Sequence, residues 1–153
     1  MSETIESRLE KFQITIPEAA QPVANYVTVI RSNNQLFISG QIPLSKGKPV
    51  AVGKVGSTVS AEKAKKSAEA CAINILAQAK SALGSLDKIK RVTKITVFVA
   101  TDPNFTDIPQ VANGASDLFV NILGDAGKHA RSAVGVCSLP MDVPVEIEAI
   151  LEV

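Results

Sequence analysis

The residues with the clearest chemical potential lie near the C-terminal end of the chain. Arg131 precedes one segment of strand-like alternation, 132–136, and Glu146 lies within a second one, 143–153. If these two segments pair as a hairpin around the loop 137–142, the midpoint between Arg131 and Glu146 falls inside that loop. The spacing therefore predicts that Arg131 and Glu146 are approximate cross-strand neighbours.

Two interpretations of such a pair remain open. An exposed cross-strand ion pair stabilises a protein by roughly 0–1 kcal/mol and has no catalytic role. Alternatively, the planar guanidinium of Arg131 binds a substrate carboxylate through two parallel hydrogen bonds, while Glu146 holds a water molecule. Spacing alone does not choose between a structural pair and an anion-binding site.

His129 is the sole histidine and lies two residues before Arg131. A lone histidine is more often a surface or capping residue than a catalyst. No HExxH pattern, Cys/His cluster or EF-hand loop accompanies it, so we expect no metal site. The phosphate-binding patterns GxGxxG and GxxxxGK[ST] are also absent, as is the nucleophile pattern GxSxG. Nucleotide-binding folds and a nucleophile elbow therefore have no support in the sequence.

The N-terminal part of the chain predicts one helix and a pair of strands. Residues 5–12 form a short amphipathic helix within an extension that covers about 1–20. Alternation at 26–30 and 35–39, with polar residues between them, predicts two strands joined by a turn. A further short strand is expected near 50–55, after a loop that is rich in glycine and lysine.

The remaining residues predict two long helices and three strands. One helix begins after an N-cap at Ser60 and ends near Gly84, and the other occupies about 107–124. Strands are expected at 91–100 and in the two alternating C-terminal segments described above. This order predicts a single α+β domain over 1–153, with both long helices packed on one face of a mixed sheet.

The other face of that sheet needs a cover if it is as apolar as the alternation implies. A second copy of the chain is the simplest cover, so we expect a homo-oligomer. Sixteen basic and fifteen acidic residues give a net charge of +1, which argues against a nucleic-acid-binding surface.

The sequence also indicates a setting for the protein. It contains neither an apolar run of membrane-spanning length nor an apolar N-terminal signal segment. Cys71 and Cys137 lie far apart and in no CxxC pattern. We therefore expect no membrane association and a cytoplasmic location with reduced thiols.

Several of these stretches together form a set that resembles the RidA (YjgF) family. The similarity extends from about Tyr26 to the C-terminus, and it rests on Arg131 and on ISGQIP at 38–43, VFV at 97–99 and LPMDVPVEIEA at 139–149. Further stretches are similar to a longer subgroup, usually labelled chorismate-mutase-like or endoribonuclease. These are GKVG at 53–56, VANGASDL at 111–118 and GKHARSAVGV at 127–136.

The resemblance implies a chorismate-mutase-like fold, a homotrimer and substrate clefts between subunits. It also implies hydrolysis of reactive 2-imino or 2-enamino acids to 2-keto acids and ammonia without a cofactor. In this family an arginine that matches Arg131 holds the substrate carboxylate, and a glutamate that matches Glu146 positions or activates water. Other site-lining positions of the family match Tyr26, Ser39, Gly40 and Asn113.

Three positions depart from the common pattern of the family. Ala133 replaces a frequent cysteine, and Ser116 replaces a frequent tyrosine on the helix. His129 lies beside the expected site, where the commoner members have no histidine, so we count it among the substrate-binding candidates. These departures keep the carboxylate-binding arginine and change the pocket for the substrate side chain.

Two other classes of function stay open. A non-catalytic or regulatory trimer would bind a small keto acid without accelerating any reaction. An endoribonuclease or translation inhibitor would need paired acid–base groups and phosphate-binding cations, whereas this chain has one histidine and no basic stripe. Chorismate mutase activity is not expected, because a dicarboxylate substrate calls for several converging cations and the chain has four arginines in all.

Overall fold

Alternating side chains in two central strands organise the sheet. The structure is a computed structural model that describes residues 2–153, so Met1 of the expected extension lies outside the described residues. β5 (Arg91–Ala100) and β7 (Val145–Glu152) pair antiparallel, and each buries one side of its alternation. The buried face of the sheet is therefore supplied mainly by these two strands.

Three further strands complete the main sheet. They are β1 (Val29–Ser32), β2 (Gln35–Gln41) and β6 (Ala130–Val136), and the order across the sheet is β1-β2-β7-β5-β6. β6 runs parallel to β5, whereas the other neighbours are antiparallel. The prediction of a mixed sheet is confirmed.

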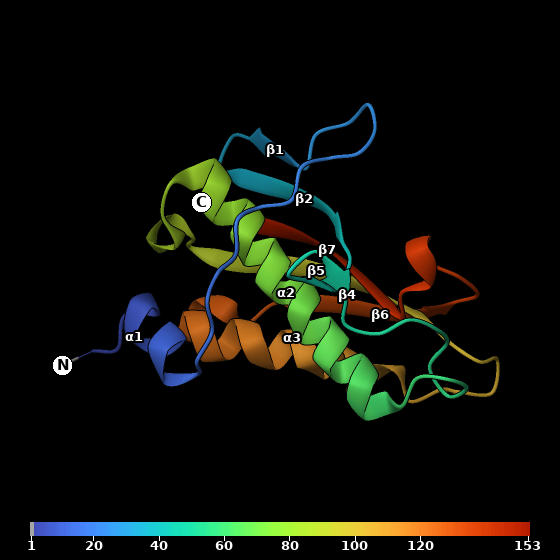
Figure 1. Cartoon of the computed structure of the whole chain (residues 1–153). Helices are drawn as coiled ribbons and strands as arrows, with labels where there is room; N and C mark the ends of the chain where they lie inside the picture. Colours follow the sequence, from blue (N-terminus) through green and yellow to red (C-terminus); the bar gives the residue numbers. More distant parts are fainter. Residues whose placement is uncertain (1) are drawn as a thin grey trace.

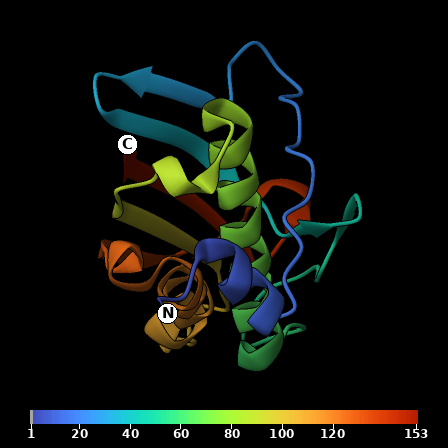
Figure 2. The same ribbon diagram turned by 90° about the vertical axis from the view of Figure 1, so that its left-hand side faces the viewer.

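Both long helices cover the same face of this sheet (Figures 1 and 2). α2 (Ala61–Leu83) begins where the Ser60 hydroxyl accepts a hydrogen bond from a first-turn N–H, and it ends at Gly84 in the left-handed conformation. α3 (Ile108–Leu123) has Pro109 in its first turn, where the missing N–H does no harm. The predicted two-layer α+β architecture is confirmed.

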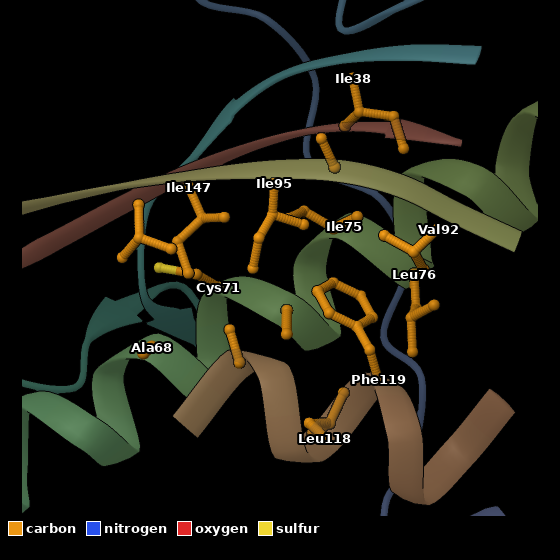
Figure 3. Packing of buried hydrophobic residues seen from close by; sticks show 14 of the residues in the cluster. Ile38, Ala68, Cys71, Ile75, Leu76, Val92, Ile95, Leu118, Phe119 and Ile147 are labelled. Atoms are coloured by element: carbon orange, nitrogen blue, oxygen red, sulfur yellow. The ribbon is translucent and has the colours of Figure 1, made fainter. Parts of the chain in front are cut away.

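Small residues bring α2 close to the sheet. Ala68, Cys71 and Ala72 are fully buried along its inner face, and larger residues such as Ile75 fill the space nearer the end of the helix. Figure 3 shows Cys71 of α2 beneath Ile147 of β7, and Phe119 of α3 beneath Ile75. The result is one continuous apolar layer between helices and sheet.

The short N-terminal helix lies against the helical layer. α1 (Ile5–Lys11) starts with a capping box between Thr4 and Ser7, and its residues pack beside α3. This confirms the short helix expected at 5–12. Among residues 2–153, none of the helices is both long and apolar enough to cross a membrane.

Shorter elements differ from the expected pattern. The strand expected at 50–55 is not formed, because Val55 makes only isolated bridges; a small hairpin precedes it instead, β3 (Leu44–Ser45) and β4 (Lys48–Pro49). The strand expected at 26–30 begins only at Val29. Single turns of 3₁₀ helix occupy the following positions: η1 (Leu86–Lys88), η2 (Gly124–Gly127) and η3 (Pro140–Asp142).

The hairpin expected between the last two strands is absent. β5 lies between β6 and β7, and each of these pairs with β5 and not with the other. The connection over 137–144 is long enough to cross the end of β5, since neighbouring strands lie only about 4.8 Å apart. The more apolar β7 takes the interior position, whereas β6, with no fully buried residue, forms the edge.

Gly114 lies at a close approach of the two long helices, and it gives a test of this packing. A Cβ at Gly114 would collide with the backbone carbonyl of Lys65 in α2. We expect Gly114→Ala to lower the free energy of unfolding by about 1–3 kcal/mol, measured by urea denaturation. Asn121→Ala, on the exposed side of α3, should change it by less than about 0.5 kcal/mol. Equal stability of Gly114→Ala and wild type would contradict the packing described.

Candidate active site

Arg131 lies on the edge strand β6 and faces the helices. The strand registers place it in one row with Ile95 and Ala149, whose side chains are buried under the helical layer. The half-buried Arg131 ends this row beside α3, where its Nη1 donates to Asn113 Oδ1 (2.8 Å) and to Ser116 Oγ (3.1 Å). Two neutral acceptors therefore hold the guanidinium in place.

The positive charge of Arg131 is not neutralised by these contacts. No ion pair joins it to a carboxylate in the part of the chain that the structure describes, whereas Arg8 and Arg91 pair with Glu3 and Glu152. Within residues 2–153, only one of its terminal nitrogens is engaged by hydrogen bonds. Arg131 thus combines a fixed position with donors that a ligand carboxylate can use.

His129 extends the contacts of Arg131 further into the protein. Its Nε2 lies 2.8 Å from Ser116 Oγ, and its Nδ1 lies 2.6 Å from the carbonyl oxygen of Gly127. The ring also packs edge-on against Phe119, with 5.9 Å between the ring centroids. We call Asn113, Ser116, His129 and Arg131 the arginine cluster.

Glu146 belongs to a second group on the opposite face of the sheet. It pairs with Phe98 of β5, and its carboxyl lies directly over Gly40, where a Cβ would be only 2.9 Å from Glu146 Cδ and Oε2. The β2 register shifts between Ile38 and Gln41, so Gly40 sits in a bulge that receives this carboxyl. A side chain at position 40 would displace it.

The same bulge holds the segment that carries Tyr26. Ser39 donates from its N–H to Thr28 O (2.9 Å) and from its hydroxyl to Val27 O (3.1 Å). Tyr26 and Gly40 both line a cavity of about 560 Å³ between this segment, β2 and α2. We call Tyr26, Ser39, Gly40 and Glu146 the glutamate cluster.

The environment of Glu146 favours its protonated form. Partial burial raises the pKa of this carboxyl, and the negative charge of Glu148 raises it further. Burial likewise raises the pKa of the Cys71 thiol, with Glu146 as a smaller cause. Cys71 is therefore an unreactive core residue, whereas the half-buried Glu146 can exchange a proton.

The two clusters lie apart within one chain. Arg131 pairs with Ile95, which pairs with Ala149, three residues along β7 from Glu146. With about 4.8 Å between strands and about 3.4 Å per residue, the Cα atoms of Arg131 and Glu146 are about 14 Å apart, and their side chains point to opposite faces. The prediction that they are cross-strand neighbours is wrong, because β5 separates their strands.

Sequence reasoning also missed the role of Ser116 as a partner of Arg131. Asn113 and Ser116 are three residues apart on α3 and so share one face of that helix. This spacing was visible in the sequence, but the helix could not be oriented toward β6 without the strand order. No group of three or more His, Cys, Asp or Glu residues able to hold a metal ion occurs within 2–153.

Comparisons with known proteins agree with this architecture. A model of the family described as Endoribonuclease L-PSP matches residues 16–153. Protein TCP17 of Trypanosoma cruzi is 41% identical over 149 residues, which cover 97% of this chain and 93% of that protein. The crystal structure of Atu1372 from Agrobacterium tumefaciens, a protein of unknown function, is 49% identical with a TM-score of 0.92, covering 97% of this chain and 92% of that one.

A more distant relative has a named activity. The 2-iminobutanoate/2-iminopropanoate deaminase of Dermatophagoides farinae is 28% identical over 139 residues, covering 90% of this chain and 93% of that protein. The chain belongs to the L-PSP family, which is the RidA (YjgF) family that its sequence resembles, and its fold is chorismate-mutase-like. Membership supports a RidA-like or related function.

The raised pKa of Glu146 predicts a pH-dependent stability difference. A carboxyl whose folded pKa exceeds its unfolded value stabilises the fold at acid pH, and this contribution is lost as the pH rises through the folded pKa. Glu146→Gln, which stays uncharged, should therefore gain stability relative to wild type as the pH rises from about 4 toward 7. Urea denaturation at a fixed protein concentration measures this difference at each pH.

Glu148→Gln provides the matched background for that experiment. In a Glu148→Gln background the negative charge of Glu148 is gone, so the pKa of Glu146 should be raised less. The stability gained by Glu146→Gln should therefore depend less on pH in that background. A stability difference that is constant with pH, or that grows toward acid pH, would contradict the environment assigned to Glu146.

Proposed function

We propose that the protein hydrolyses reactive 2-imino and 2-enamino acids to 2-keto acids and ammonia. The observation that carries this proposal is the state of Arg131, which is fixed by neutral Asn113 and Ser116 and keeps its charge for an anion. A guanidinium with free donors is suited to a substrate carboxylate. Such a clamp would hold the adjacent C2 atom at a defined place, which is the main requirement for a reaction of an already electrophilic imine.

Glu146 supplies the proton transfers in this proposal. Water adds to C2 of the imine as Glu146 accepts one of its protons and delivers it to the nitrogen, which gives a carbinolamine. Glu146 then relays the hydroxyl proton of the carbinolamine to the nitrogen, the C2–N bond breaks as the C2=O bond forms, and ammonia leaves. Imine and one water thus become keto acid and one ammonia, with no oxidant or cofactor consumed. A carboxyl whose pKa is raised by burial is suited to both accepting and returning the proton.

We further propose that each site is completed between two copies of the chain, within a homotrimer. Arg131 and Glu146 point to opposite faces of one sheet and cannot reach one substrate within a protomer. The open face of the sheet also exposes Ile30, Phe37 and Val134, an apolar surface that a neighbouring copy can cover. An arginine cluster from one copy would then face the glutamate cluster of the next.

Two further considerations support this choice of function and setting. The deaminase of Dermatophagoides farinae is a relative whose name states this activity. Ribonuclease chemistry has less support, because both ring nitrogens of His129 are engaged, by Ser116 and by Gly127. We place the reaction in the cytoplasm, consistent with the two free cysteines, Cys71 and Cys137.

Loss of the carboxylate clamp tests the activity itself. Arg131→Ala should reduce the acceleration of 2-iminobutyrate hydrolysis at least about 100-fold, measured as the appearance of 2-ketobutyrate. Arg91→Ala is the matched control, because that arginine pairs with Glu152 on the outside of the sheet. Light scattering should show the same oligomer for wild type, Arg131→Ala and Arg91→Ala. Undiminished activity of Arg131→Ala would eliminate the proposed reaction.

Mixed oligomers test where the site is formed. Arg131→Ala and Glu146→Gln chains should each be inactive alone, yet activity should return when they are co-expressed and assemble together. In a random mixture of equal amounts, one half of the chains keep Arg131 and the other half keep Glu146. About one quarter of the interfaces therefore combine an intact Arg131 with an intact Glu146 from the neighbouring copy. A site within one protomer would give no recovery.

A further inference from the structure

The proposed reaction uses Ser116 as an anchor of Arg131 but leaves His129 without a task. Ser116 and His129 are half-buried, and neither contacts the substrate carboxylate in the proposed reaction. Both are departures from the common pattern of the family. We propose that they form a positioning pair, in which His129 orients the Ser116 hydroxyl and this hydroxyl orients the Arg131 guanidinium. The inference rests on the proposed function in one respect, namely that the ligand carries a carboxylate.

With a neutral His129 ring, the hydrogen bonds of this group have a single consistent direction. The carbonyl oxygen of Gly127 can only accept, so His129 must donate from Nδ1 across the 2.6 Å contact. In the neutral ring Nε2 then accepts, and the Ser116 hydroxyl donates to it over 2.8 Å. With its own proton committed to His129, Ser116 Oγ presents a lone pair to Arg131 Nη1 at 3.1 Å. A serine hydroxyl would otherwise rotate freely.

The base of this chain of hydrogen bonds is rigid. Gly127 has no room for a Cβ, which would collide with the backbone carbonyl of Phe119 in α3. The Phe119 side chain is fully buried and holds the His129 ring edge-on. The Gly127 carbonyl and the His129 ring are therefore both fixed relative to α3, the helix that carries Ser116.

The geometry also explains why two acceptors are used for one guanidinium nitrogen. Asn113 Oδ1 and Ser116 Oγ receive hydrogen bonds from the same Nη1 atom of Arg131. Together they restrict rotation about the terminal bonds of the side chain and leave the other donors for the ligand. Loss of the Ser116 contact would leave one anchor and a more mobile guanidinium.

Four variants separate this role from a structural one. His129→Phe keeps a ring against Phe119 but cannot accept from Ser116, and Ser116→Ala removes the hydroxyl. His129→Gln restores an acceptor, and Ser116→Thr restores the hydroxyl. The first two should weaken the binding of 2-ketobutyrate roughly 3- to 10-fold, the range of one net hydrogen bond, and the second two should recover most of it.

Two further comparisons make the test specific. The double variant Ser116→Ala/His129→Phe should bind no more weakly than Ser116→Ala alone, because His129 acts only through Ser116. Binding of 2-ketobutyramide, which lacks the carboxylate, should be the same in all variants. Additive losses, or equal losses for the amide, would overturn the positioning role, as would unchanged 2-ketobutyrate binding in His129→Phe.

A readout without ligand distinguishes failure of this inference from failure of the proposed function. In ¹⁵N NMR spectra, His129 should show a protonated Nδ1 and an accepting Nε2. The Arg131 guanidinium should rotate slowly in wild type and freely in Ser116→Ala and His129→Phe. If these signals appear but wild type binds no 2-ketobutyrate, the proposed function fails while the positioning pair stands. A guanidinium equally mobile in all proteins would refute the pair, whatever the binding result.

Discussion

The position of β5 between β6 and β7 constrains every part of the candidate site. β5 pairs with both neighbours, and the two registers determine which side chains share a face. Arg131 consequently points toward the helices and Glu146 points away from them. One protomer therefore holds two separate groups of candidate side chains, and in the proposed reaction a complete site would form where these groups meet across an interface.

The packing of the helical layer fixes the positions of the side chains in the arginine cluster. Small residues in α2 let it lie close to the sheet, and Gly114 lets α3 lie close to α2. This packing fixes the depth of α3 over β6, so that Asn113 and Ser116 reach the guanidinium of Arg131. A core built of alanine, valine and isoleucine thereby sets the position of a charged group at its edge.

Much of this arrangement could be predicted from the sequence, for identifiable reasons. Both long helices carry clear periodicity and end signals at Ser60 and Gly84, and β5 and β7 alternate over enough residues to be recognised. The pairing of β6 could not be predicted, because the 137–144 connection fits a hairpin as well as a crossing over β5. Strand order is a long-range property that local patterns do not encode.

Two features of the site depended on that missing strand order. The register shift that places Gly40 under Glu146 follows from the pairing of β2 with β7. The partnership of Ser116 with Arg131 follows from the packing of α3 over β6. The family resemblance named members of both clusters as candidates, although the hairpin geometry proposed for Arg131 and Glu146 was wrong. Candidate residues were thus more accessible to sequence reasoning than the spatial relation between them.

A crystal structure of the oligomer with bound 2-ketobutyrate is the most direct measurement of the central claim. We expect the carboxylate of the ligand to contact the Arg131 guanidinium of one copy, with Asn113 and Ser116 still behind it. The keto carbon should face Glu146 of a neighbouring copy. A ligand held within a single protomer, or a carboxylate bound away from Arg131, would contradict the account.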